Sequence, residues 1–180
     1  SRGFGSIHDR ALLLSSSLLS RIDEGNAANT VFSLQARYYD QISDRRLFFM
    51  TLEASRGQNL DLDNVLQLGG DTGLRGFPLR YQSGESKLLL SAEQRYFIDW
   101  YPLKLARVGG AVFADIGRTW GNNSLGRPAA GWLKDVGFGL RLVPTRSSGR
   151  DVIHVDIAFP LDGDASIDDV QFLVESKRSF

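Results

Sequence analysis

Residues 68–77, Leu-Gly-Gly-Asp-Thr-Gly-Leu-Arg-Gly-Phe, place a single arginine, Arg75, among four glycines. Glycine allows positive φ angles and tight reversals, so this segment can fold back on itself and deliver a guanidinium where a regular helix or strand could not. The segment lacks the Lys-Ser/Thr end and the following helix of a phosphate-binding loop. The sequence therefore predicts a loop that serves to position Arg75.

A buried arginine needs a carboxylate partner, and the best candidate is Asp115. Asp115 lies in the run Val-Phe-Ala-Asp-Ile-Gly over residues 112–117, where the residue character alternates. Because successive side chains of a strand point to opposite faces, the alternation puts Asp115 on the more polar face. We therefore expect an ion pair between Arg75 and Asp115.

About eight segments have the length and the period-two pattern of strands, and almost nothing has the pattern of an amphipathic helix. In one of them, Phe32 and Leu34 would face one way while Ser33 and Gln35 face the other. The predicted strands cover residues 8–22, 28–42, 45–58, 85–99, 104–119, 132–146, 150–161 and 169–180. The sequence thus predicts one all-β, antiparallel domain over residues 1–180.

The connection over residues 59–84 contains the arginine segment and is much longer than the other predicted turns. Long loops without secondary structure of their own are usually functional, so we expect this one to fold inward. The alternation also gives the strands a polar inner face, where we expect a solvated network of ionised side chains. Its members would be Glu53, Glu93, Asp156, Arg37, Arg95 and Arg141.

Composition and charge exclude several classes of function. The 21 basic and 21 acidic residues give no net charge, which argues against nucleic acid as a partner. The chain has no cysteine and its two histidines are far apart, so we expect no metal site and no cofactor. No serine near His154 has a nucleophile-elbow pattern, and we expect no enzymatic activity.

Hydropathy does not identify a membrane helix, because no stretch approaches 18 consecutive apolar residues. Transmembrane β-strands give an equally weak signal, since only every second residue contacts lipid. Trp120 and Trp132 flank a glycine-rich loop, and such amphipathic rings favour the boundary between water and lipid. No signal peptide is visible at Ser1, so a mature or partial chain is expected.

Three features together resemble a known family. The tetrad Leu74, Arg75, Gly76 and Phe77 resembles the inward-folded loop motif of the outer-membrane-protein-eighty-five superfamily of bacterial surface antigens. The strand motif that binds this loop resembles residues 113–117, with Phe113, Asp115 and Gly117. The terminal Phe180, with Phe172 and Val174 at alternate positions before it, resembles the sorting signal of bacterial outer-membrane barrels.

The resemblance implies a transmembrane β-barrel in the bacterial outer membrane. The chain would supply about eight strands, half of a sixteen-strand barrel, and a second copy in a homodimer or missing strands would complete it. Its partners would be the lipid bilayer and an unfolded polypeptide, which the barrel inserts or translocates without catalysis. Two alternatives remain open, namely the membrane anchor of a larger secreted enzyme, such as a patatin-like lipase, and a soluble β-rich binding module.

Overall fold

The computed structural model describes residues 2–7, 10–23, 26–61, 64–98, 100, 106–121, 131–144, 151–164 and 167–178. The predicted all-β, antiparallel class is confirmed, and the described residues contain no α-helix. The strands are β1 (Arg2–Ile7), β2 (Arg10–Asp23), β3 (Asn26–Ser43), β4 (Arg46–Gln58), β5 (Leu66–Leu68), β6 (Gln82–Gly84), β7 (Ser86–Phe97), β8 (Ala106–Trp120), β9 (Leu133–Pro144), β10 (Asp151–Pro160) and β11 (Gln171–Arg178), and η2 (Gly70–Thr72) is a single 3-10 turn.

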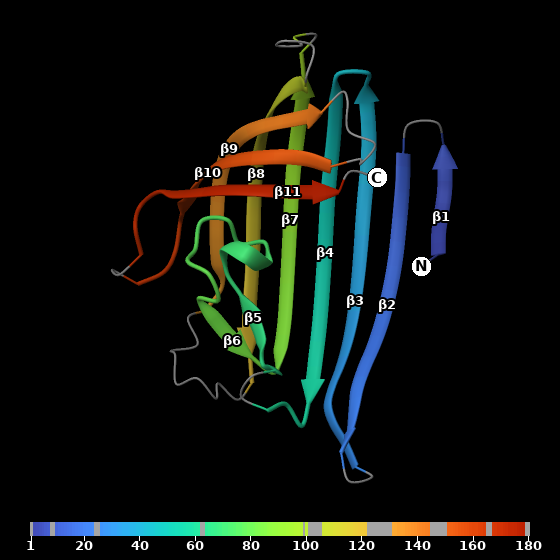
Figure 1. Ribbon diagram of the computed structural model, residues 1–180, viewed down its shortest axis with the longest axis vertical. Coiled ribbons are helices and arrows are strands. Elements are labelled where there is room, and N and C mark those ends of the chain that lie inside the picture. The colour runs from blue at the N-terminus through green and yellow to red at the C-terminus, as the bar shows by residue number, and fades with distance from the viewer. Residues whose placement is uncertain are drawn as a thin grey trace.

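Nine of these strands form one sheet in the order β1-β2-β3-β4-β7-β8-β9-β10-β11. Each strand pairs with its neighbour in the sequence except where β5 and β6 intervene between β4 and β7. The sheet does not close into a barrel, because β1 and β11 are its two edges. It curls strongly instead, so that β9, β10 and β11 sweep across in front of β7 and β8 (Figure 1).

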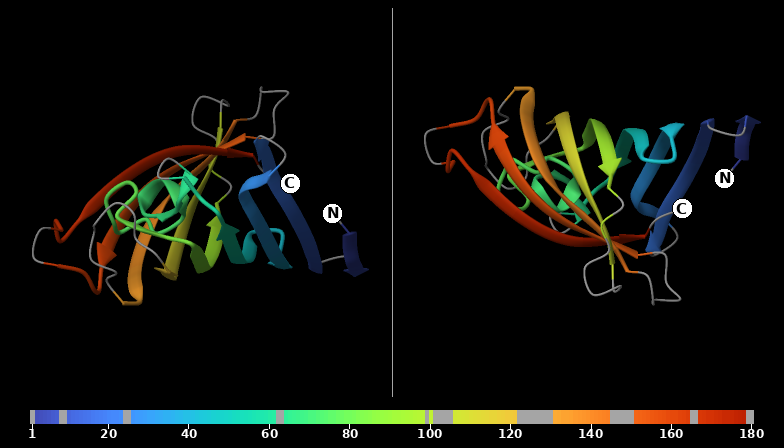
Figure 2. Two further views of the ribbon diagram at one scale, coloured as in Figure 1. Left: turned by 90° about the horizontal axis from the view of Figure 1, so that it is seen from below. Right: turned by 90° about the horizontal axis from the view of Figure 1, so that it is seen from above.

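The segment between β4 and β7 lies in the hollow of this curl. The short strands β5 and β6 pair with each other, and with η2 they sit on the concave side of the sheet (Figure 2). Five buried residues form the apolar core there, and Tyr81 and Ile167 pack against it. The core residues are Leu68, Leu74, Phe77, Leu89 and Leu133. The core thus lies between the loop and the sheet.

The two faces of the sheet differ in the way that the alternation predicts. On β8, Phe113 and Asp115 point inward and are buried, whereas Val112, the residue before Phe113, is 58% exposed on the convex side. The cross-strand register joins such exposed residues into one surface over β2–β11, which we call the outer apolar face. Its members are Leu12, Leu14, Leu18, Phe32, Leu34, Leu52, Val112, Val136, Phe138, Leu140, Ile153, Phe172 and Val174.

Candidate functional site

The arginine segment makes a compact reversal that its glycines permit. Gly69 accepts backbone hydrogen bonds from Thr72 and Leu74, both at 3.0 Å, and donates one to the Thr72 hydroxyl at 2.8 Å. Gly73 ends the turn with φ +110°, in the left-handed region that glycine adopts without strain. A Cβ on Gly69 would collide with the Pro78 carbonyl oxygen. The reversal therefore depends on glycine at two points, and it aims the next residues at the sheet.

Apolar side chains on both sides of Arg75 anchor the tip of the loop. Leu74 is fully buried and Phe77 is 2% exposed. The Phe77 ring lies 5.5 Å from the ring of Tyr81, whose hydroxyl donates a hydrogen bond to Asp164 Oδ2 at 3.0 Å. Asp164, which follows β10, thus also helps to hold the loop. This apolar packing fixes the backbone from which Arg75 extends.

Arg75 and Asp115 are brought together in a bidentate ion pair. Arg75 Nε lies 2.8 Å from Asp115 Oδ2, and Nη2 lies 2.9 Å from Oδ1. The Arg75 side chain is 4% exposed and that of Asp115 is fully buried. Burial alone lowers the pKa of Arg75, but the hydrogen bonds and charge of Asp115 outweigh it and raise the pKa above its ordinary value. Arg75 therefore stays charged at any physiological pH.

The strand motif around Asp115 forms the seat for the guanidinium. Phe113, two residues earlier on the same face, places its ring 3.4 Å from the Arg75 guanidinium carbon, a cation–π contact. Gly117, two residues later, lies under Leu68, and a Cβ there would approach the Leu68 Cδ2 atom to 2.8 Å. The three inward positions of residues 113–117 thus contact the loop, each in a different way.

Glu93 extends the pair into a network. Its carboxylate accepts hydrogen bonds from Arg75 Nη1 at 2.7 Å, from Arg95 Nε at 2.6 Å and from Arg141 Nε and Nη2, both at 2.8 Å. Arg141 is fully buried and also forms an ion pair with Asp156. A carboxylate shared by three arginines is the centre of the site, because no other acid in the described part of the chain contacts as many cations.

Asp135 holds the backbone next to Arg75. Its Oδ2 atom accepts a hydrogen bond from the Gly76 amide at 3.0 Å, and it lies opposite Asp115 across β8 and β9. A Cβ on Gly76 would lie 2.5 Å from the Asp135 Cβ. Gly76 of the tetrad is therefore required by close approach, since any side chain there would push the loop off the sheet.

Sequence reasoning placed Glu93, Arg141 and Asp156 on the inner face, which the structure confirms, but it expected them to be solvated. That expectation is wrong, because the loop covers them and none is more than 4% exposed. Asp135 was missed. Its only sequence signal is its inward position in the alternation of β9, and its partner depends on the register with the loop.

The predicted sorting residues lie apart from this network. Phe172 and Val174 on β11 are 76% and 70% exposed on the outer apolar face. Phe180 lies outside the described residues. In the described ranges, no group of three or more His, Cys, Asp or Glu side chains is placed to hold a metal ion. The same residues form no helix long and apolar enough to cross a membrane.

No family model and no curated protein sequence matches this chain. The site is defined by its geometry. That geometry is a buried ion-pair network that holds one loop against the concave face of a curled sheet.

Proposed function

We propose that this chain forms part of an outer-membrane β-barrel of the outer-membrane-protein-eighty-five type, which inserts or translocates polypeptides without catalysing a reaction. One observation supports the proposal most directly. Arg75, from the loop motif of residues 74–77, is bound by Asp115, from the strand motif of residues 113–117, in a buried bidentate pair. The two segments that resemble the superfamily are thus in contact as the resemblance implies.

The outer apolar face supports a membrane environment. Phe172 is 76% exposed, Leu18 is 68% exposed and Phe138 is 51% exposed, although all three are large and apolar. Soluble proteins rarely expose continuous apolar surfaces of this kind, whereas a barrel strand shows apolar residues to lipid and polar residues to its interior. The same face argues against a soluble β-rich module. It is compatible with an anchor barrel, which remains the alternative.

The free edges of the sheet supply a mechanism for handling a polypeptide. Among the strands that the structure describes, β1 and β11 each have one side without a strand partner. Such an edge can pair with an extended client segment through backbone hydrogen bonds, which makes recognition tolerant of sequence. In lipid the edges must be paired, because unsatisfied backbone groups are costly there. A barrel completed around this sheet would have its seams at β1 and β11.

The number of strands limits how such a barrel can close. We predicted eight strands, and the structure adds β1, so the sheet has nine. Since all neighbours are antiparallel, β1 and β11 run in the same direction. A closed antiparallel ring has an even number of strands. A barrel that includes all nine strands of this sheet therefore needs an odd number of further strands. Two copies that insert in the same orientation form an antiparallel ring only if β1 leaves the sheet and β2 becomes the edge.

Reconstitution tests this function. The chain would be folded into proteoliposomes, and its mobility on gels with and without heating and its mass in detergent would be measured. A urea-unfolded outer-membrane barrel protein would then be added as client. We expect a heat-modifiable species, and we expect the client to fold faster than in empty liposomes, because an exposed strand edge templates its hairpins.

The outcomes separate the candidate functions. A heat-modifiable protein that leaves the client's folding rate at the level of empty liposomes would reject the insertion role and favour an anchor. A monomer that is folded and monodisperse in buffer without detergent would favour the soluble module and reject the membrane proposal altogether.

A further inference from the structure

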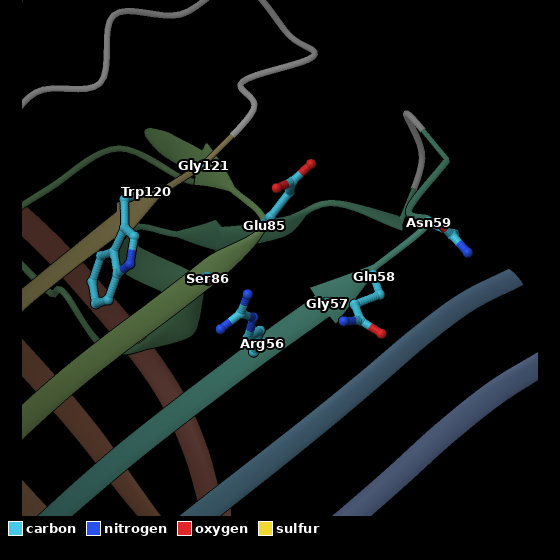
Figure 3. Close-up of a pocket in the computed structure, with 8 residues that line it drawn as sticks. All are labelled: Arg56, Gly57, Gln58, Asn59, Glu85, Ser86, Trp120 and Gly121. Carbon is cyan, nitrogen blue, oxygen red and sulfur yellow. The ribbon is translucent and has the colours of Figure 1, made fainter.

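A polar pocket opens at the rim of the sheet where β4 ends, β7 begins and β8 ends (Figure 3). Its volume is about 620 Å³, within the range of sites that hold small ligands. It lies away from the arginine network, which occupies the concave side. The lining residues are Arg56, Gly57, Gln58, Asn59, Glu85, Ser86, Trp120 and Gly121.

Three of these side chains stand in one row across neighbouring strands. The register pairs Arg56 with Ser86 and Ser86 with Trp120. Arg56 is exposed and Trp120 is 41% exposed, so the row belongs to the convex side. Trp120 and Arg56 lie on either side of Ser86, and the carboxylate of Glu85 points away from them (Figure 3). The row therefore presents a guanidinium, a hydroxyl and an indole together.

Two arginines on this side of the sheet, Arg56 in the pocket lining and Arg118 opposite Leu88 beside it, lack the carboxylate partners that the inward arginines have. Arg56 makes no ion pair with any other residue that the structure describes. Arg118 lies two residues before Trp120 on the same face of β8, and its buried Nε atom has no hydrogen-bond partner within the described ranges. Leaving the buried Nε atom of Arg118 without an acceptor is costly, whereas the exposed guanidinium of Arg56 keeps its donors open to solvent. The pair is thus suited to an anion from outside the chain.

The position of the row identifies the kind of anion. One pleat further from the rim, Ala54 lies opposite Leu88, and Leu52 then lies opposite Leu90 on the outer apolar face. The row therefore lies at the edge of the apolar surface, where Arg and Trp side chains meet lipid headgroups in membrane proteins. The strand ends that the two long connections join, from β4 to β7 and from β8 to β9, lie at this rim. Such barrels carry their longer loops on the outer side.

We infer that Arg56, Arg118, Ser86 and Trp120 bind the phosphate-bearing headgroup of a lipid in the outer leaflet. This inference rests on the proposed membrane function. Guanidinium groups bind phosphate oxygens through paired N–H donors, and the hydroxyl and the indole N–H supply further donors at the same level. The indole ring would lie at the boundary between headgroup and acyl chain. Glu85 takes no part in the contact.

Native mass spectrometry of the full chain tests the site. The protein would be embedded in nanodiscs of phosphatidylcholine with a minor share of phosphatidate, and the lipids retained on release would be compared. We expect the wild-type chain to retain phosphatidate selectively. Arg56→Gln and Arg118→Gln should each reduce that selectivity about tenfold, the loss expected for one charge-assisted contact. Glu85→Gln and the exposed loop variant Arg80→Gln should leave it unchanged.

Each other result has a distinct meaning. Insertion without selectivity for phosphatidate, or equal selectivity in Arg56→Gln and the wild type, would overturn the headgroup site and leave the membrane proposal intact. Displacement of retained phosphatidate by inorganic phosphate at similar concentration would mean a site for soluble anions and would overturn the lipid assignment. A chain that does not enter nanodiscs would overturn both proposals together.

Discussion

Replacing Arg75 with alanine is expected to lower the free energy of unfolding by about 3–5 kcal/mol, the usual cost of breaking a buried ion pair from one side. The variant leaves Asp115 buried without its bidentate partner and removes one of the three arginines that Glu93 contacts. It also removes the guanidinium that covers the Phe113 ring. The measurement is urea unfolding in detergent micelles, followed by the difference in gel mobility between folded and unfolded protein.

A double-mutant cycle separates the coupling energy between Arg75 and Asp115 from the general loss of packing. Asp115→Ala should cost a similar amount, and the double variant should cost clearly less than the sum of both. Arg80→Ala is the matched control, because Arg80 is an exposed loop arginine 4.0 Å from Asp71 and should change stability by about 1 kcal/mol or less. Additive effects of Arg75→Ala and Asp115→Ala would show that the pair does not hold the loop.

Replacing Glu93 with glutamine is expected to destabilise the fold at least as much as the loss of Arg75, by about 3–5 kcal/mol or more. Glutamine keeps the size of the side chain but removes the charge that Arg75, Arg95 and Arg141 share. Arg141 is fully buried, so it cannot turn to water for compensation. The same urea titration measures this effect, with limited proteolysis of the loop as an independent readout.

Glu53→Gln provides the comparison for Glu93. Glu53 is also on the inner face, but it contacts one lysine, Lys87 at 2.6 Å, and its side chain is 26% exposed. Its replacement should cost about 1 kcal/mol or less. If Glu93→Gln and Glu53→Gln had equal effects, the ionic network would be a solvated lining and not the element that holds the loop.

The long strands could be predicted well from the sequence, because a strand with one buried face alternates apolar and polar residues. The predicted segment 104–119 corresponds to β8 (Ala106–Trp120), and the segment 8–22 corresponds to β2 (Arg10–Asp23). The strands β5 and β6 were missed because three residues are too few to show a period. β1 was missed because its six residues are too few to show a clear alternation.

The charged site was only partly predictable for a different reason. Arg75 and Asp115 stand in glycine-rich and alternating contexts that single them out locally. Glu93, Arg141 and Asp135 acquire their roles only when three strands and the loop are in register. No local pattern gives that register, nor does it show that the loop excludes water from the inner face.

The most direct test of the central claim is a cysteine scan along β3, since the chain has no native cysteine. Single cysteines would replace each residue from 32 to 37, and their reaction with a water-soluble maleimide would be followed in proteoliposomes. Lipid contact by the outer apolar face predicts slow reaction at positions 32, 34 and 36, and fast reaction at positions 33, 35 and 37. Uniformly fast reaction along the strand would contradict the account, because the outer apolar face would then meet water.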